Sequence, residues 1–236
     1  MENQPDFQAG HLFLLDKPLQ WTSFDVVNKL RYSLKRKLGL KKFKVGHAGT
    51  LDPLATGLLL ICCGKKTKDI NDLMRLEKTY TGTITLGATT PSYDLETSIE
   101  NVVPVLLTNE QIISACTHFV GELEQTPPIF SAKKIDGKKA YEAARKGQEI
   151  VMKKSNISIS SFSITSIQKS KHLETGLDCE FEVSCSKGTY IRSLAFDFGN
   201  KLGVGGFLSA LRRTQIGEHS VANSLSVEDA LALIEG

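Results

Sequence analysis

A single carboxylate within a stiff, glycine-rich stretch is the feature of the sequence best suited to chemistry. The stretch reads Gly46-His47-Ala48-Gly49-Thr50-Leu51-Asp52-Pro53-Leu54-Ala55-Thr56-Gly57. Three glycines and a proline within twelve residues predict neither a regular helix nor a regular strand. Pro53 fixes its own φ and moves Asp52 out of the α region. A turn cap is the simplest role for Asp52, but a rigidly held carboxylate is also suited to act as a nucleophile.

A dense basic segment leads into this stretch. Between Val26 and Leu51 the sequence has no acidic residue and eight basic ones: Lys29, Arg31, Lys35, Arg36, Lys37, Lys41, Lys42 and Lys44. A solvated helix face would explain any one of them, whereas eight in an acid-free run favour contact with nucleic-acid phosphates. The net charge of +3 is small, so the distribution of charge carries this argument.

Composition and cysteine usage set the broad class. With 41% hydrophobic and 23% charged residues, the chain is typical of a soluble globular protein. The polar N-terminus does not resemble a signal peptide, and no apolar run approaches the ~20 residues that span a bilayer. The five cysteines lack zinc-ligand spacing, so we expect buried thiols in a reducing, cytoplasmic setting, with no metal and no disulfide.

The elements that must position Asp52 can be read from apolar periodicity. Strands are predicted at 11–15, 58–61 and 79–86, the last with Tyr80 and Ile84 on one face and threonines on the other. Thr22 or Ser23 should cap a helix that ends at Gly39. A further helix is predicted at 66–75. The segment Gly64-Lys65-Lys66-Thr67 is not a P-loop, because a hydrophobic strand separates it from Gly57.

The second half of the chain alternates in the same way. An irregular segment at 87–98 contains Asp94, and helices are predicted at 107–119 and 140–146. A strand at 157–164 should contain a β-bulge at 160–161, where the apolar parity slips. After a strand at 177–185, Thr189 should cap a helix that reaches Leu202, with Tyr190 and Arg192 in its first turn. The chain then continues with a predicted strand at 203–213 and a predicted helix at 227–234, which Ser226 should cap.

Strands outnumber helices, and short turns join neighbouring elements. This pattern predicts an α+β fold, in which helices flank a mixed, mainly antiparallel sheet.

The glycine-rich stretch resembles the signature loop of the TruB/dyskerin family of tRNA pseudouridine synthases. Other motifs of the family occur in the same order: Asp16-Lys17-Pro18, Thr22-Ser23, Lys78-Thr79-Tyr80, Pro128, Ser131-Ala132, Lys134, Gly137, Tyr141, Arg145, Cys185-Ser186-Lys187-Gly188-Thr189-Tyr190-Ile191-Arg192 and Leu211-Arg212-Arg213. The resemblance implies the pseudouridine synthase fold, with one catalytic domain at 10–236 and a basic, thumb-like insertion at 127–153. We expect the C-terminal PUA-type domain of longer members to be absent.

The resemblance also implies a reaction. The family isomerises uridine-55 in the T-loop of tRNA to pseudouridine: the glycosidic bond breaks, the uracil turns, and C5 rejoins C1′. The target base must first be flipped out of its stack. The implied partner is the tRNA T stem-loop, without cofactor, metal or membrane, and we expect a monomer.

Catalytic roles are carried over residue by residue. Asp52 is the implied catalytic carboxylate, and attack at C1′, attack at C6 and removal of a ribose proton all remain open. Arg192 should lie within ~4–6 Å of Asp52 and favour its ionised form. Tyr80 should stack on the flipped base and serve as a base or proton carrier.

The remaining implied residues bind substrate. His47 should fill or brace the space that the base leaves, and Tyr190 and Leu211 should line the uracil pocket. Lys17 should position backbone, and Asp94 should lie near the base-flipping path. Without the resemblance, plain structural roles would be the default for each of these residues.

Two other functions fit parts of the pattern. An RNA-binding module could use the basic segment without catalysis. A nucleoside or glycoside hydrolase could use Asp52 and would release free uracil. Such hydrolases usually pair two carboxylates, and no second acid lies near Asp52 in the sequence.

Overall fold

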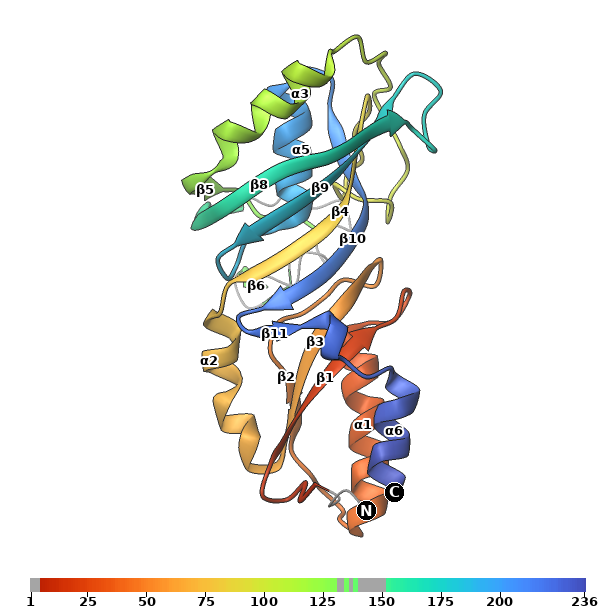
Figure 1. Ribbon diagram of the computed structural model, residues 1–236, viewed down its shortest axis with the longest axis vertical. Coiled ribbons are helices and arrows are strands. Elements are labelled where there is room, and N and C mark those ends of the chain that lie inside the picture. Colours follow the sequence, from red (N-terminus) through yellow and green to blue (C-terminus); the bar gives the residue numbers. More distant parts are fainter. Residues whose placement is uncertain (1–4, 131–133, 136–137, 140–151) are drawn as a thin grey trace. The chain divides into compact units, whose positions relative to one another are not determined.

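The computed structural model describes residues 5–130, 134–135, 138–139 and 152–236 (Figure 1). The chain forms two compact units: unit 1 is Met1–Tyr80 with Leu211–Gly236, and unit 2 is Thr81–Ala210. Strands β4 (Lys78–Leu86) and β10 (Gly206–Ile216) each have residues in both units. The predicted α+β class, with a mixed and mainly antiparallel sheet, is confirmed. No helix in the described part of the chain is long and apolar enough to cross a bilayer.

Unit 1 is built around strand β3 (Ala55–Cys63). Its partners are β1 (His11–Lys17) and β2 (Val45–His47), both antiparallel, and the parallel end of β10, which in turn pairs with β11 (His219–Ser220). Leu59 and Ile61 pack into the core beneath the helices, whereas Leu58 and Leu60 belong to a second apolar cluster. Because it is buried on both faces, β3 reads as a continuous apolar run.

The glycine-rich stretch is more regular than predicted. Val45–His47 forms β2, and β3 begins at Ala55 instead of at 58, so the irregular loop is confined to 48–54. The prediction of no regular strand in this stretch was therefore wrong at both ends. Backbone pairing explains the difference, since Leu211, Arg212 and Arg213 of β10 pair in parallel with the first three residues of β3.

Gly57 makes this close pairing possible. Its φ is +101°, and a Cβ there would lie 2.3 Å from the carbonyl oxygen of Arg213. We expect Gly57→Ala to lower the free energy of unfolding by at least about 3 kcal/mol, because backbone strain and the carbonyl both oppose the methyl group. Gly39 is the matched control: its φ is +64° and nothing lies within 4 Å of the added Cβ, so only the strain remains. Equal losses in urea unfolding of the two variants would contradict this role of Gly57.

Helix α1 (Ser23–Leu38) follows its sequence signals closely. Thr22 forms the N-cap within a capping box with Asp25, and Gly39 ends the helix at φ 64°. Its apolar stripe packs against β1 and β3, beside helix α6 (Val227–Glu235), whose N-cap is Ser226 as predicted (Figure 1). Between Gly64 and Arg75 the predicted helix is present only in its second half. The 3-10 helix η1 (Gly64–Asp69) precedes α2 (Ile70–Arg75).

Unit 2 contains the rest of the large sheet. In strand order they are β10, β4, β9 (Leu177–Cys185), β8 (Ser155–Lys169) and β5 (Gly121–Gln125). The bulge predicted in β8 is present between Ile159 and Ser161, and a second register shift follows between Ile164 and Ser166. Strand β4 alternates as expected except at Thr85, which is buried and donates its hydroxyl proton to Asp178 or Ser209.

Helices cover this sheet and enclose an aromatic core. The helix predicted at 107–119 is α3 (Asn109–Ala115) followed by the 3-10 helix η2 (Cys116–Phe119). Phe198 of α5 (Ile191–Lys201) meets Phe162 of β8 at 5.4 Å between ring centroids. The five cysteines are buried, as expected, and burial raises the pKa of the Cys179 thiol to about 12.

Of the predicted insertion at 127–153, the structure describes 127–130, 134–135, 138–139 and 152–153. Lys134–Ile135 (β6) and Lys138–Lys139 (β7) form an antiparallel pair. The predicted helix at 140–146 and the motif residues Ser131-Ala132, Gly137, Tyr141 and Arg145 lie outside the described residues. The prediction of one catalytic domain at 10–236 stays a prediction.

Candidate active site

Backbone contacts on both sides of Asp52 fix the loop that carries it. The buried Ser23 hydroxyl accepts a hydrogen bond from the Leu51 N–H at 2.8 Å and lies 3.2 Å from the Leu51 carbonyl oxygen. On the other side, the Pro53 carbonyl accepts from the Gln20 N–H at 2.8 Å. Because the residues before and after it are both held, Asp52 has little backbone freedom, which favours a fixed reacting geometry.

Two buried cations support the same loop. Arg213 donates through Nε to the Leu58 carbonyl at 2.7 Å and through its guanidinium to the Gly49 carbonyl at 3.0 Å. Lys17 and Arg213 lie on either side of Gly57 in the strand register. Burial lowers the pKa of Lys17 to about 8, and the negative charge of Asp52 opposes that shift. Asp52 therefore lies in a part of unit 1 that contains buried positive charge.

Lys17 has the contacts of a residue that positions backbone. Its ammonium donates to the Pro18 carbonyl at 2.9 Å and to the Trp21 carbonyl. These bonds shape the turn between β1 and α1, directly before the Ser23 anchor.

His47, Tyr80 and Leu211 come from three strands of unit 1. His47 ends β2, and burial together with the charge of Arg213 lowers its pKa, so its imidazole is neutral at pH 7. Tyr80 is a buried residue of β4. Leu211 is half-buried and pairs in register with Ala55, three residues after Asp52. Unit 1 thus contains five of the predicted site residues: Lys17, His47, Asp52, Tyr80 and Leu211.

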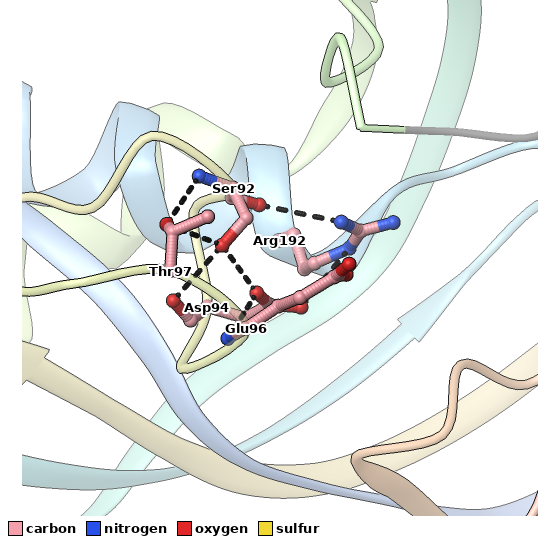
Figure 2. A network of polar contacts seen from close by, with 5 residues as sticks. All are labelled: Ser92, Asp94, Glu96, Thr97 and Arg192. Carbon is pink, nitrogen blue, oxygen red and sulfur yellow. Dashed lines mark hydrogen bonds and ion pairs between the residues drawn. The ribbon is translucent and has the colours of Figure 1, made fainter. Parts of the chain in front are cut away.

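Unit 2 contains the other three, and two of them are in contact. Arg192 lies in the first turn of α5, and its Nε is 3.6 Å from a carboxylate oxygen of Asp94 (Figure 2). Both side chains are buried. The guanidinium also donates to the Ser92 carbonyl at 3.3 Å. A buried ion pair is stable only when further hydrogen bonds satisfy its partners, so the surroundings of Asp94 matter.

Ser92 and its neighbours supply those bonds. The Ser92 hydroxyl donates to Asp94 Oδ1 at 2.6 Å, and the same oxygen accepts from the Glu96 N–H at 3.0 Å (Figure 2). Thr97 in turn accepts from the Ser92 N–H at 3.0 Å. The loop that the sequence showed only as irregular is thus a closed polar network that fixes both Asp94 and Arg192.

Tyr190 is held by a side chain that the sequence analysis missed. Gln125, at the end of β5, accepts from the Tyr190 N–H at 2.8 Å and donates to its carbonyl at 3.0 Å. The prediction that Thr189 caps α5 was wrong: the cap is Tyr190, and the Thr189 hydroxyl donates instead to the Ser186 carbonyl at 3.0 Å. Gln125 gave no local signal, because its partner lies 65 residues away.

The basic segment is only partly available to a ligand. Arg31 donates to the Val45 carbonyl at 2.9 Å, and Arg36 and Lys37 both bind Glu235 at the end of α6. These three residues therefore have structural partners. Of the lysines in this basic segment, Lys35 is half-buried, and the exposed ones are Lys29, Lys37, Lys41, Lys42 and Lys44.

We expect Ser92 to act as a positioning residue for Arg192. Ser92→Ala removes the 2.6 Å hydrogen bond to Asp94 and should lower the catalytic rate of the candidate site about 10-fold, because a bond to a charged group is lost. Ser92→Thr keeps the hydroxyl and should restore most of the rate. Steady-state kinetics with thermal unfolding of each variant test this role. A full rate in Ser92→Ala, or no rescue by threonine, would contradict it.

Comparison with known proteins identifies the family. The model of the TruB family pseudouridylate synthase N-terminal domain matches residues 35–191. tRNA pseudouridine synthase B of Flavobacterium johnsoniae is 52% identical over 224 residues, which cover 94% of this chain and 95% of the relative. The Phocaeicola vulgatus protein of the same name is 48% identical over 225 residues, covering 94% and 92%.

Solved structures agree with the sequence relatives. The chain resembles one in the archaeal box H/ACA sRNP Nop10–Cbf5 complex, with a TM-score of 0.65 and 25% identity, and one in a Cbf5–Nop10–Gar1 complex, with a TM-score of 0.66 and 28% identity. Each match covers 96% of this chain and 54% of the other, so this chain spans about half the length of those proteins. The chain therefore belongs to the TruB family of pseudouridylate synthases and is an enzyme of that class.

Proposed function

We propose that this enzyme isomerises uridine-55 in the T-loop of tRNA to pseudouridine, with Asp52 as the catalytic carboxylate. The observation that carries the proposal is the loop at 48–54, which holds Asp52 between two anchored neighbours beside buried cations. Relatives named tRNA pseudouridine synthase B support tRNA as the substrate. Because the substrate is tRNA, we also expect the enzyme to act in the cytoplasm.

The proposed reaction balances within the RNA. The C1′–N1 bond breaks, the uracil turns while it remains bound, C5 forms a new bond to C1′, and the C5 proton is released as N1 gains one. The base reacts only after it has left its stack. Asp52 must be ionised for each of its three candidate roles, which are attack at C1′, attack at C6 and removal of a ribose proton.

The other site residues have roles that suit this chemistry. We assign Arg192 to the charge of Asp52, with Ser92 and Asp94 fixing the guanidinium. The buried Tyr80 stacks on the flipped base, and the neutral His47 fills the space that the base leaves. Tyr190 and Leu211 line the uracil pocket, and Lys17 holds the backbone that precedes α1.

Binding to tRNA should depend on salt through the exposed lysines. We expect the affinity to fall steeply as salt rises, and Lys42→Ala should reduce the slope of log K against log [salt] by about 0.7 to 1. Lys201→Ala, an exposed lysine at the end of α5, is the control with little effect on the slope. Fluorescence anisotropy at several salt concentrations measures both slopes. If the affinity of the wild-type protein for tRNA did not change with salt, contact between these lysines and phosphates would be contradicted.

Product analysis separates the proposed function from its alternatives. Unmodified tRNA that carries tritium at C5 of uridine is incubated with the enzyme, and nucleosides, free base and released tritium are measured. The proposal predicts pseudouridine together with an equal amount of released tritium. Free uracil would indicate a hydrolase, and bound but unchanged tRNA would indicate a binding module.

A further inference from the structure

Two exposed aromatic side chains lie on the helix that carries much of the basic segment. Of the large apolar residues that the described part of the chain exposes, only Phe24 (59%) and Tyr32 (69%) are aromatic, and both belong to α1. Aromatic side chains bury a large apolar area when they pack, so their exposure leaves a favourable interaction unused. Because both rings belong to one helix, their charged neighbours decide whether this face is a binding surface.

The two rings belong to one row along the outer face of α1. Phe24, Asn28 and Tyr32 are spaced four residues apart, so they follow one another on the same side of the helix. We call these three residues the α1 aromatic row. The Arg31 guanidinium lies 6.0 Å from the centre of the Phe24 ring, within the range of a cation–π contact.

Charge beside the row favours a polyanion as its partner. Lys29 and Lys35 lie on the same helix, and Asp25, the only acidic residue of α1, is engaged in the capping box with Thr22. The cores of protein–protein interfaces are depleted in lysine, whereas surfaces that bind single-stranded nucleic acid combine cations with aromatic rings. The composition of this face thus fits RNA better than a protein.

The row also begins next to the catalytic loop. Phe24 directly follows Ser23, whose hydroxyl holds the backbone of Leu51, the residue before Asp52. From Phe24 to Tyr32 the helix rises about 12 Å, at 1.5 Å per residue. An RNA whose target uridine is bound at Asp52 can therefore place nucleotides a few positions away against this face.

We propose that the α1 aromatic row binds an unpaired segment of the substrate RNA, with one or two bases stacked on Phe24 and Tyr32 and the phosphates near Lys29 and Lys35. This inference rests on the proposed function for the identity of the RNA. Stacking uses the π-face that every base has, so the row supplies affinity with little dependence on base sequence.

The double variant Phe24→Ala/Tyr32→Ala tests the inference. Its Kd for unmodified tRNA at fixed salt should rise about 10-fold or more, while the slope of log K against log [salt] stays unchanged because no charge is removed. Phe24→Trp/Tyr32→Trp should bind at least as well as the wild type, because the larger rings still stack. Leu106→Ala, which trims a residue that is 89% exposed in unit 2, is the control with wild-type affinity.

Two results would overturn the inference. A wild-type Kd in the alanine double variant would assign the row to another partner, such as a protein. An equal rise in the Kd for tRNA in the alanine and tryptophan variants would show that damage to the helix, and not the loss of stacking, weakens binding. The proposed function fails separately: a wild-type enzyme that binds tRNA through the row and forms no pseudouridine would contradict only the reaction.

Discussion

Asp52→Asn is expected to lower the rate of pseudouridine formation by at least about 10³-fold, because catalysis needs the negative charge of this carboxylate as nucleophile or base. Asparagine has nearly the same shape and size. The anchors of the loop are made by neighbouring residues, Ser23 with Leu51 and Gln20 with Pro53, so the backbone should keep its course. The loss should therefore appear in kcat, with the Kd for tRNA changed little.

Single-turnover kinetics on unmodified tRNA, together with Kd and thermal unfolding, measure this effect. Asp72→Asn is the matched control, because its carboxylate is 82% exposed and its contact with Arg75 is long, at 3.8 Å. It should keep the full rate. A rate within 10-fold of the wild type for Asp52→Asn would remove Asp52 from the chemistry.

Arg192→Lys is expected to lower kcat about 10²-fold although the positive charge is kept. The guanidinium contacts two groups at once, the Asp94 carboxylate at 3.6 Å and the Ser92 carbonyl at 3.3 Å. A lysine ammonium is a point donor and cannot reproduce this planar fork, so the charge would be displaced from its position in the site. Lysine is a better test than methionine, which would leave Asp94 buried without its cation.

Single-turnover kinetics on unmodified tRNA also measure this effect. Arg75→Lys is the control, because the Arg75 side chain is 69% exposed. Thermal unfolding should show Arg192→Lys folded, because the buried ion pair with Asp94 keeps both charges. Turnover within about 2-fold of the wild type would mean that the fork has no role, and that Arg192 only stabilises unit 2.

Much of the fold could be predicted because local signals determined it. Helix α1 has its cap at Thr22 and its stop at Gly39, and both signals act within a few residues. The bulge in β8 was visible as a slip in apolar parity between Ile159 and Phe162. Such features depend on backbone preferences and side-chain alternation, which a sequence shows directly.

The errors lie where distant segments meet. Strand β3 begins at Ala55 because β10, more than 150 residues later, pairs with it. Helix α5 begins after Tyr190 because Gln125 holds that residue's backbone. Neither partner has a sequence pattern that predicts the contact. Periodicity alone could therefore not locate the first residue of β3 or of α5.

In the candidate site too, residues with local sequence signals could be predicted, and residues that act through long-range contacts could not. Asp52 was found from its own loop, since glycine and proline spacing is local. Ser23 was considered only as a helix cap, and Ser92 and Arg213 were given no role, because each supports the site through a backbone group or carboxylate that folding brings near. Asp94 and Arg192, 98 positions apart in the sequence, were predicted separately from the family resemblance, and only the structure shows their contact.

Mapping pseudouridine by position in one unmodified tRNA, after incubation with the wild-type enzyme and with Asp52→Asn, tests the central claim most directly. The account predicts full conversion of uridine-55 and of no other uridine by the wild type, and none by the variant. Conversion at a different position, or equal conversion by the variant, would contradict it.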